Sequence, residues 1–546
     1  MQDETRVFQA RRIITMNPSV PVATHVAVRG GRVLGVGTAE QMAAFGPAIT
    51  DDRFAAKVIL PGFVEGHSHL FEGLTWQDPY FGFFDRRGPD GRIWPGLKSI
   101  EEVVARLQDI ERAMGDADSP LTAWGFDPIY FGGRRMNRAD LDQVSTQRPV
   151  AITHASGHIM NVNGAVLDRA GLTGDTDLDG LARGPDGQPS GELLGPEVMG
   201  RVRRVIGGGS MERAIDAPSL RRFGEIARMA GVTTAADLLN ELTPATVGIY
   251  EAVTQEGGFP LRIVPALAAR AYSVPDGIAR WRELAGHNNA KLHFGLVKLV
   301  VDGSIQGFTA RLRWPGYHNG APNGMWYLAP AELAAVVLDY HRAGAHLHIH
   351  TNGDEATEVA VEMIGRALQE APRGDHRHTL QHCQMPDEAL FRRMKALGIC
   401  CNIFANHIFY WGDAHLALTM GPTRAARMDA CGTALRLGVP FAIHSDAPVT
   451  PLGPLFTAWC AVNRRTASGA VLGEHERIPV ADALRAITLG AAYTMRMDHL
   501  VGSIDVGKFA DFAVLDDDPL EVPPETLKDV GVHATVLGGV PFEGPA

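Results

Sequence analysis

Apolar, β-rich runs recur along the middle of the chain, and they do not alternate between apolar and polar residues. This pattern is typical of parallel strands that are covered on both faces. We count eight such runs: 58–64, 232–238, 261–267, 294–301, 345–350, 379–382, 399–404 and 440–444. Segments with helical periodicity lie between most of them, as at 219–230, 330–343 and 388–397. Repeated βα units predict an α/β protein built on a (β/α)8 TIM barrel.

Short strand-like segments also occur at both ends of the chain. Residues 26–29 and 32–36 flank two glycines, which predicts a β-hairpin with a two-residue turn. Residues 510–515 and 534–537 are β-rich as well, and glycines punctuate the sequence around them. We therefore predict that the two ends of the chain combine in one small β-sandwich domain.

The connection between the first predicted barrel strand, which ends at residue 64, and the second, which begins at residue 232, is far longer than a βα crossover requires. It is rich in aromatic residues, and we predict an insertion at 75–220 that folds as a cap over the barrel mouth. The predicted boundaries are 1–60 for the N-terminal part of the β-sandwich, 61–490 for the barrel with its insertion, and 491–546 for the C-terminal part of the sandwich.

The composition and net charge of the chain disfavour several classes of function. With 45% hydrophobic and 21% charged residues the chain is an ordinary globular protein. Its formal net charge of -11 disfavours nucleic acid or an anionic membrane as a partner, because both attract clustered lysine and arginine. No apolar run is long enough for a membrane span, and the acidic first residues lack the apolar region of a signal peptide.

The five cysteines are odd in number and lack CxxC spacing, so we expect reduced thiols in the core. Together with the missing signal peptide, this favours a cytoplasmic protein whose partner is a small molecule. The aromatic-rich insertion also favours a homodimer.

Candidate chemistry begins with Gly66-His67-Ser68-His69, which follows directly on the first apolar run. Residues two apart in an extended strand point the same way, so both histidines can reach one metal ion. A lone HxH pair is weak evidence, since capped or surface histidines are the commoner outcome.

Further residues of metal-ligand type lie in or just after four other predicted strands. They are Lys298, His350, His382 and Asp446. Catalytic groups of a TIM barrel come from the carboxyl ends of different strands. Five strands that each supply such a residue predict a metal centre at the barrel mouth.

Several longer motifs surround these residues. They are Lys298 with Asp302-Gly303-Ser304, His350-Thr351-Asn352-Gly353-Asp354, Gln381-His382-Cys383, Ser445-Asp446-Ala447-Pro448-Val449, and the segment 502–511, which begins with Gly502 and contains Gly507. With the HxH pair, they resemble the amidohydrolase superfamily, in particular its YtcJ-like branch (amidohydrolase family 3), which includes N-substituted formamide deformylase. The resemblance covers nearly the whole chain.

The resemblance implies a centre of one or two zinc ions. Five residues would bind or border the metal: His67, His69, His350, His382 and Asp446. It further implies that Lys298 is carbamylated and bridges two ions; a lysine paired with a nearby carboxylate is the alternative.

Zinc lowers the pKa of a bound water to about 7 and polarises a substrate carbonyl. Asp446 is then the predicted general base, which takes the proton of the attacking water and delivers it to the leaving amine. His382 is predicted to hold the carbonyl oxygen or to complete the shell of the second ion. The expected reaction is hydrolysis of a non-peptide amide C–N bond, as in an N-acyl or N-formyl amine or an aryl amide.

Three residues are candidate substrate contacts. His158 lies in the insertion, and His407 and Trp411 follow the seventh predicted strand, where an aromatic wall would favour an apolar or aryl substituent. A structural cluster of the loop is the alternative for His407 and Trp411.

Other functions remain open. Cyclic amides and N-acyl amino acids are alternative substrates, and the same scaffold suits a metal-dependent decarboxylase or isomerase, or a silent binding protein. A serine amidase would use Gly207-Gly208-Gly209-Ser210 with Lys298 as base. We disfavour it, because the motif does not form a nucleophile elbow and the clustered metal ligands would have no role.

Overall fold

The structure, a computed structural model, describes residues 4–116, 118–131, 134–157, 159–207 and 215–544. The chain divides into two compact units. The barrel unit comprises Met1–His69, Gly224–Ala447 and Leu452–Ala546, and the inserted unit comprises Leu70–Phe223 and Pro448–Pro451.

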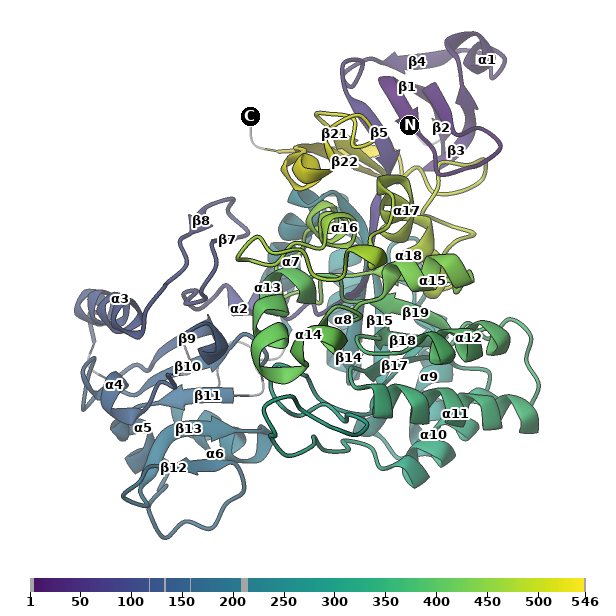
Figure 1. The fold of residues 1–546 in the computed structure, drawn as a ribbon. Coiled ribbons are helices and arrows are strands. Elements are labelled where there is room, and N and C mark those ends of the chain that lie inside the picture. The colour runs from purple at the N-terminus through teal and green to yellow at the C-terminus, as the bar shows by residue number, and fades with distance from the viewer. Residues whose placement is uncertain (1–3, 117, 132–133, 158, 208–214, 545–546) are drawn as a thin grey trace. The chain divides into compact units, whose positions relative to one another are not determined.

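An eight-stranded parallel sheet forms the centre of the barrel unit (Figure 1). Its strands are β6 (Phe63–Ser68), β14 (Val232–Asn240), β15 (Arg262–Ala268), β16 (Leu296–Val300), β17 (His346–Thr351), β18 (Thr379–His382), β19 (Cys400–Ile403) and β20 (Phe441–Ile443). They lie side by side in this order, and a parallel bridge between Ser68 and Ala447 joins the two ends of the sheet. The predicted TIM barrel is thereby confirmed.

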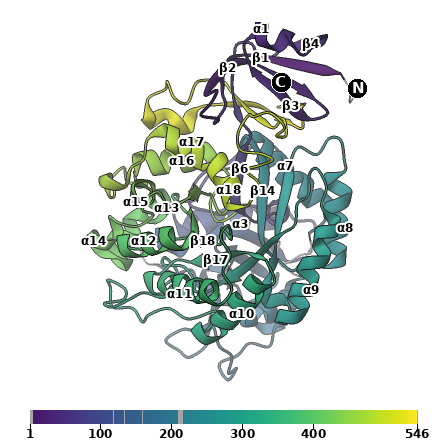
Figure 2. The ribbon, with the colours of Figure 1, turned by 90° about the vertical axis from the view of Figure 1, so that its right-hand side faces the viewer.

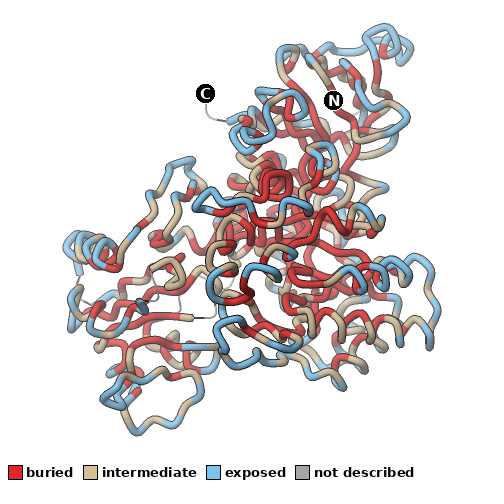
Figure 3. The backbone as a smooth tube through the Cα atoms, in the orientation of Figure 1, coloured by how far each residue is buried: buried red, intermediate tan, exposed pale blue. Residues whose placement is uncertain are grey.

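Helices surround these strands. They are α8 (Pro244–Thr254), α9 (Val274–Leu284), α10 (Pro330–Arg342), α11 (Asp354–Glu370), α12 (Glu388–Leu397), α13 (His407–Ala414), α14 (Gly421–Ala425), α15 (Cys431–Leu437), α16 (Pro454–Asn463), α17 (Val480–Ala486) and α18 (Leu489–Thr494). Figure 2 shows α8 to α12 outside the strands, and Figure 3 shows the strands buried. Local sequence sets the helix ends: at α12, the Asp387 side chain accepts a hydrogen bond from the Leu390 N–H, and Gly398 ends the helix at a φ of 73°.

Both ends of the chain form a second sheet in the barrel unit. Its eight strands are β1 (Thr5–Ile14), β2 (Val22–Arg29), β3 (Arg32–Gly37), β4 (Ala48–Asp51), β5 (Val58–Pro61), β21 (Phe512–Leu515), β22 (Val532–Leu537) and β23 (Val540–Glu543), with helix α1 (Ala39–Ala43) between β3 and β4. Strand β5 pairs with β1 on one side and with β21 on the other, so the two ends share one hydrogen-bonded sheet. Phe8 packs against Phe54 and Phe512 in its core.

The predicted strand at 58–64 is wrong as a single element. Strand β5 ends at Pro61 in the terminal sheet, and β6 begins at Phe63 in the barrel. Gly62 joins them where the backbone passes Thr233 so closely that a Cβ would lie 2.0 Å from the threonine Oγ1. A continuous apolar run does not reveal this change of sheet, because both strands are buried on both faces.

The inserted unit has its own five-stranded sheet, in the order β12-β13-β11-β10-β9. Its strands are β9 (Leu121–Phe126), β10 (Val150–His154), β11 (Ile159–Val162), β12 (Leu181–Arg183) and β13 (Pro189–Leu194), and a hairpin of β7 (Arg86–Arg87) and β8 (Ile93–Trp94) lies outside this sheet. Its helices are α2 (Glu72–Thr75), α3 (Ile100–Ala113), α4 (Arg138–Asp142), α5 (Gly164–Arg169) and α6 (Pro196–Ile206), and α7 (Ala217–Met229) runs from this unit into the barrel unit. The role of the insertion as a cap stays a prediction.

Two sequence predictions concern the chain as a whole. All five cysteines are buried and unbridged, which confirms the expected core thiols. Within the part of the chain that the structure describes, no helix combines the length and apolarity needed to cross a bilayer.

Candidate metal centre

The first and last barrel strands bring the HxH pair to Asp446. His67 lies near the end of β6, His69 follows it, and Asp446 lies just beyond β20. Two backbone hydrogen bonds join the segments, from the Asp446 N–H to the His67 carbonyl (3.1 Å) and from the His69 N–H to the Ala447 carbonyl (2.7 Å). The closure of the barrel therefore positions these three side chains.

The three side chains converge on one point. The Nε2 atoms of His67 and His69 lie 3.2 and 3.3 Å from Oδ1 of Asp446. Together with that oxygen, they offer one ligand atom each within 4.8 Å of one another. Two imidazoles and a carboxylate in this arrangement suit a zinc ion.

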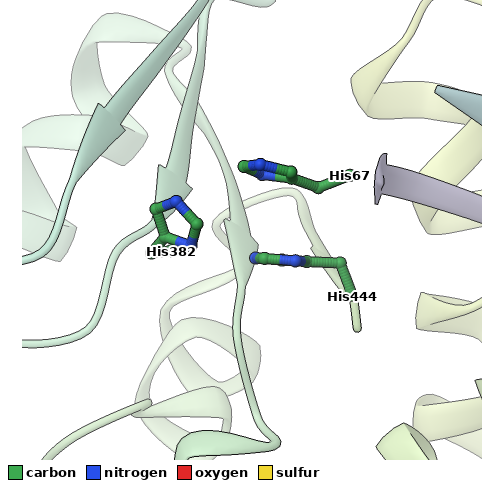
Figure 4. A group of neighbouring side chains, drawn as sticks. All are labelled: His67, His382 and His444. Atoms are coloured by element: carbon green, nitrogen blue, oxygen red, sulfur yellow. The ribbon is translucent and has the colours of Figure 1, made fainter. Parts of the chain in front are cut away.

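A second group shares His67 and contains two other histidines (Figure 4). The ring of His67 stacks on that of His444, with centroids 4.5 Å apart, and lies 4.7 Å from the ring of His382. All three side chains are buried, and burial lowers the pKa of each well below the usual range of histidine. The neutral ring that results is the form that binds a metal ion.

His382 and Asp446 occupy unusual backbone conformations where their strands end. Their φ angles are 69° and 53°, in the left-handed region that non-glycine residues seldom adopt. His382 Nδ1 lies 3.9 Å from Oδ2 of Asp446. Such strained positions concentrate at functional sites, where the surrounding structure holds them.

Lys298 lies in β16 with its Nζ buried and without a hydrogen-bond partner in the described part of the chain. Burial lowers the pKa of this lysine to about 7, and the charge of Asp446 opposes that shift. The alternative of a tight lysine–carboxylate pair is therefore not what the structure contains.

His350 is only partly brought into the centre. Its ring lies 4.4 Å from that of His382, but its Nε2 is 3.2 Å from the carbonyl oxygen of Gly303 and 3.7 Å from Asp302 Oδ1. Asp302 is fully buried and also accepts hydrogen bonds from the Asn352 and Gly353 N–H groups. The loop after β16 thus holds the end of β17.

The donor set fits a metal ion. Several buried nitrogen and oxygen atoms at this centre have no hydrogen-bond partner among the described residues, although each type is a metal ligand or, for lysine, becomes one after carbamylation. They are Lys298 Nζ, His382 Nδ1, both ring nitrogens of His444 and Asp446 Oδ1. Unsatisfied polar groups of this kind are costly unless something binds them.

The predicted substrate contacts have different outcomes. His407 and Trp411 lie in α13, are buried, and have ring centroids 5.7 Å apart. His407 Nδ1 also lies 3.2 Å from Asp429 Oδ1. Their contact with a substrate stays a prediction. His158, like Gly208, Gly209 and Ser210 of the serine alternative, lies outside the described residues.

Sequence reasoning missed three residues that the structure brings to the centre: His444, Glu65 and Gln381. The spacing of His444 and Asp446 repeats that of His67 and His69, and this signal was available in the sequence. Glu65 accepts hydrogen bonds from the Ser445 hydroxyl (2.9 Å) and N–H (3.2 Å), and burial raises the pKa of this carboxyl to about 8. Only the folded barrel reveals such cross-strand contacts.

Comparison with known proteins agrees with this site. A model of the amidohydrolase family matches residues 56–542. The chain therefore belongs to the amidohydrolase family, and this membership supports a metal-dependent hydrolase.

Individual relatives cover almost the whole chain. The chain is 26% identical to Protein LONG AFTER FAR-RED 3 of Arabidopsis thaliana, over 96% of this chain and 89% of the relative. It is 24% identical to the putative amidohydrolase YtcJ of Bacillus subtilis (strain 168), over 94% of each chain. It is also 24% identical to N-substituted formamide deformylase of Arthrobacter pascens, over 95% of this chain and 94% of the relative. The resemblance predicted from the motifs is confirmed.

The fold also matches solved structures. An uncharacterized metal-dependent hydrolase from Pyrococcus horikoshii OT3 superimposes with a TM-score of 0.73 at 20% identity, over 95% of this chain and 99% of the other. The architecture is therefore that of a known hydrolase structure.

Proposed function

We propose that this protein hydrolyses a non-peptide amide C–N bond at a zinc centre in the barrel. The observation that carries the proposal is the convergence of His67, His69 and Asp446, whose candidate ligand atoms lie within 4.8 Å of one another. The family membership supports it, since the matched region includes every candidate ligand.

Zinc would be held by His67, His69 and Asp446, with His382 and His350 available for a second ion. Bound there, zinc supplies a nucleophilic water at neutral pH and polarises the carbonyl of the amide. Lys298 is the candidate bridge: its buried Nζ would become an anionic ligand by adding carbon dioxide, with loss of a proton. Carbamylation would give the lysine the partners that it lacks in the protein alone.

Asp446 would be the general base. Its carboxylate oxygens face His67, His69 and His382, so a water molecule held among these side chains lies within reach of the carboxylate. Asp446 takes the proton that this water loses when it attacks the carbonyl carbon. It then delivers that proton to the amine nitrogen as the C–N bond breaks. His382 would hold the carbonyl oxygen in the same step, or complete the shell of the second ion.

The name of one relative and two aromatic side chains support the substrate class that we propose. One relative is named N-substituted formamide deformylase, which makes N-formyl and N-acyl amines the first candidates. His407 and Trp411 would favour an apolar or aryl substituent on the nitrogen. We propose that the protein acts on such a small amide in the cytoplasm.

The test is a substrate panel run on zinc-loaded and on metal-stripped protein. The panel contains N-substituted formamides, anilides, cyclic amides and N-acyl amino acids, and release of the free amine is measured. We expect cleavage of at least one class with zinc, loss of that activity with phenanthroline, and recovery when zinc is restored. Activity that survives complete removal of metal would refute the proposal.

A further inference from the structure

Behind His67 lies a buried chain of hydrogen bonds that the mechanism above does not use. Gln381, in β18, places its side-chain Oε1 2.7 Å from Nδ1 of His67. Its Nε2 lies 2.6 Å from Nδ1 of His348, and Asn402 donates from Nδ2 to the same Oε1 at 3.0 Å. All four side chains are buried, and apart from His67 none of them belongs to the candidate ligands.

The position of one proton decides whether His67 can bind a metal ion. A neutral imidazole carries a proton on one nitrogen and a lone pair on the other, and only the lone pair binds metal. The nitrogen of His67 that faces Asp446 is Nε2, at 3.2 Å. The proton must therefore be on Nδ1, and it needs an acceptor there.

His69 shows the same arrangement with a different acceptor. Its Nδ1 lies 2.6 Å from the carbonyl oxygen of Leu238. A carbonyl only accepts, so Nδ1 of a neutral His69 carries the proton and Nε2 keeps its lone pair toward Asp446. His69 thus takes its tautomer from the backbone, whereas among the described residues the hydrogen-bond partner of His67 Nδ1 is a side-chain amide.

We propose that Gln381 is a positioning residue of the metal centre, which holds the proton of His67 on Nδ1 so that Nε2 is free to bind the ion. This inference rests on the proposed function. Asn402 sets the amide orientation, because its Nδ2 donates to Oε1 of Gln381, and Nε2 of Gln381 is then left to donate to Nδ1 of a His348 ring whose proton is on Nε2. A reversed amide would donate to Nδ1 of His67, move the ring proton to Nε2 and block the ligand position.

Tight packing keeps this chain in place. Gly66 precedes His67, and a Cβ at that position would lie 2.9 Å from Nδ2 of Asn402. Asn402 therefore packs directly against the backbone of β6 beside His67. Partners of this kind typically change metal affinity by 10–100-fold when removed.

The experiment compares zinc affinity with stability in three variants of the full chain. Gln381→Leu removes the acceptor, Gln381→Glu keeps it as a carboxylate, and Thr379→Val is the matched control. Thr379 lies two residues earlier on the same strand and donates to the carbonyls of Arg377 (3.0 Å) and Thr494 (3.2 Å), without touching His67. The zinc dissociation constant is measured by competition with a chromogenic chelator, and the thermal midpoint is measured on the metal-free protein.

We expect Gln381→Leu to weaken zinc binding about 10–100-fold and Thr379→Val to leave it within a few-fold of the wild type. Gln381→Glu should bind zinc as tightly as the wild type, although its buried carboxylate lowers the metal-free midpoint most. A merely structural role predicts the opposite order, because affinity would then follow stability. Equal loss in Gln381→Leu and Gln381→Glu, or no loss in Gln381→Leu, overturns the inference.

A second measurement needs no variant at Gln381. In zinc-loaded wild type with ¹⁵N-labelled histidine, the His67 signals are assigned by their absence in His67→Asn, and they should report a protonated Nδ1. A protonated Nε2 overturns the inference and leaves the proposed function standing. A wild-type protein that binds no zinc overturns both.

Discussion

The barrel unit contains two groups of buried histidines, one at each end of its strands. The carboxyl-end group consists of His67, His382 and His444. The amino-end group lies at the starts of β17 and β18 and at the end of α10, and consists of His341, His346, His376 and His378. Both groups are buried to a similar degree, and they differ in what their ring nitrogens bind.

In the amino-end group, hydrogen bonds account for most of the ring nitrogens. Nε2 of His341 donates to the Ala371 carbonyl (2.7 Å), so its Nδ1 accepts from Nε2 of His378 (2.9 Å). Nδ1 of His378 in turn accepts from the Leu347 N–H at 3.1 Å. His346 and His376 likewise reach backbone carbonyls through Nε2, at 2.5 and 2.7 Å. Each ring is thereby fixed as one neutral tautomer.

The carboxyl-end group leaves nitrogens without such partners. Both ring nitrogens of His444, and Nδ1 of His382, lack a hydrogen bond to any described residue. A buried nitrogen without a hydrogen-bond partner is unfavourable, and such atoms are retained where a bound ligand supplies the missing interaction. In a TIM barrel the carboxyl ends of the strands carry the chemistry and the amino ends carry stability. The comparison indicates that the hydrogen-bond partners of a buried histidine, and not its burial, distinguish a candidate metal ligand from a structural residue.

The largest difference between the two groups should appear in catalysis. Replacing Asp446, which faces the carboxyl-end group, by asparagine keeps the size of the side chain but removes the base. We expect kcat to fall about 10²–10⁴-fold with little change in the thermal midpoint. His378→Leu should retain kcat when assayed below its own midpoint. Full activity of Asp446→Asn would disprove the assignment of the base.

Zinc should stabilise the protein only through the carboxyl-end group. At a free zinc concentration of about 100 times the dissociation constant, binding adds about 2.7 kcal/mol. Thermal scans with and without zinc should show this increase in the wild type and in His378→Leu, and none in His67→Asn. An equal increase in His67→Asn would show that zinc binds elsewhere.

Removing a partnered histidine should cost more stability than removing an unpartnered one. His378→Leu leaves the Leu347 N–H and His341 Nδ1 unpaired, which should cost about 2 kcal/mol or more and lower the metal-free midpoint by several degrees. His444→Leu breaks no hydrogen bond to a described residue, so we expect little or no loss. The reverse order of midpoints would contradict the comparison.

A smaller effect follows from pH. Burial, followed by neighbouring histidines and arginines, lowers the pKa of His378 well below its usual value of 6.5. Below about pH 6.5 the unfolded chain then binds more protons than the folded protein, so stability is complete above that pH. It falls as the pH drops toward the folded pKa, by up to ~1.4 kcal/mol per unit for this residue.

The groups that face His378 are His341, His346, His376 and Arg373. Because these histidines titrate in the same direction, the measurement compares slopes. Between pH 7.5 and 5.5 the midpoint of metal-free His378→Leu should decline less steeply than that of the wild type. Parallel slopes would show that His378 contributes nothing to the acid sensitivity.

Sequence reasoning succeeded where periodicity and spacing carry the information. Seven of the eight apolar runs each coincide with one barrel strand, because strands buried on both faces must be apolar throughout. The predicted convergence of the HxH pair and Asp446 is also found, since ligand-type residues at strand ends come together once the barrel closes, and their role as metal ligands stays a prediction. Family resemblance then supplied the chemistry that spacing alone leaves open.

The remainder depends on contacts between distant segments. The run at 58–64 is two strands, because β5 pairs with β1 and β21 in the terminal sheet whereas β6 pairs with β14 in the barrel. The orientation of His350 is set by the loop around Asp302 and Gly303, whose path no local pattern predicts. Gln381 belongs to a motif quoted from the sequence, but its bond to His67 spans 314 positions along the chain.

The placement of β5 between β1 and β21 has a consequence for biosynthesis. A ribosome releases β5 (Val58–Pro61) long before β21 (Phe512–Leu515), because nearly the whole barrel lies between them in the sequence. Until then β5 is the outer strand of an incomplete sheet, with backbone groups open to pairing with other nascent chains. A premature stop before Phe512 would leave that edge exposed permanently, so such a truncation should cause aggregation even with every candidate metal ligand present.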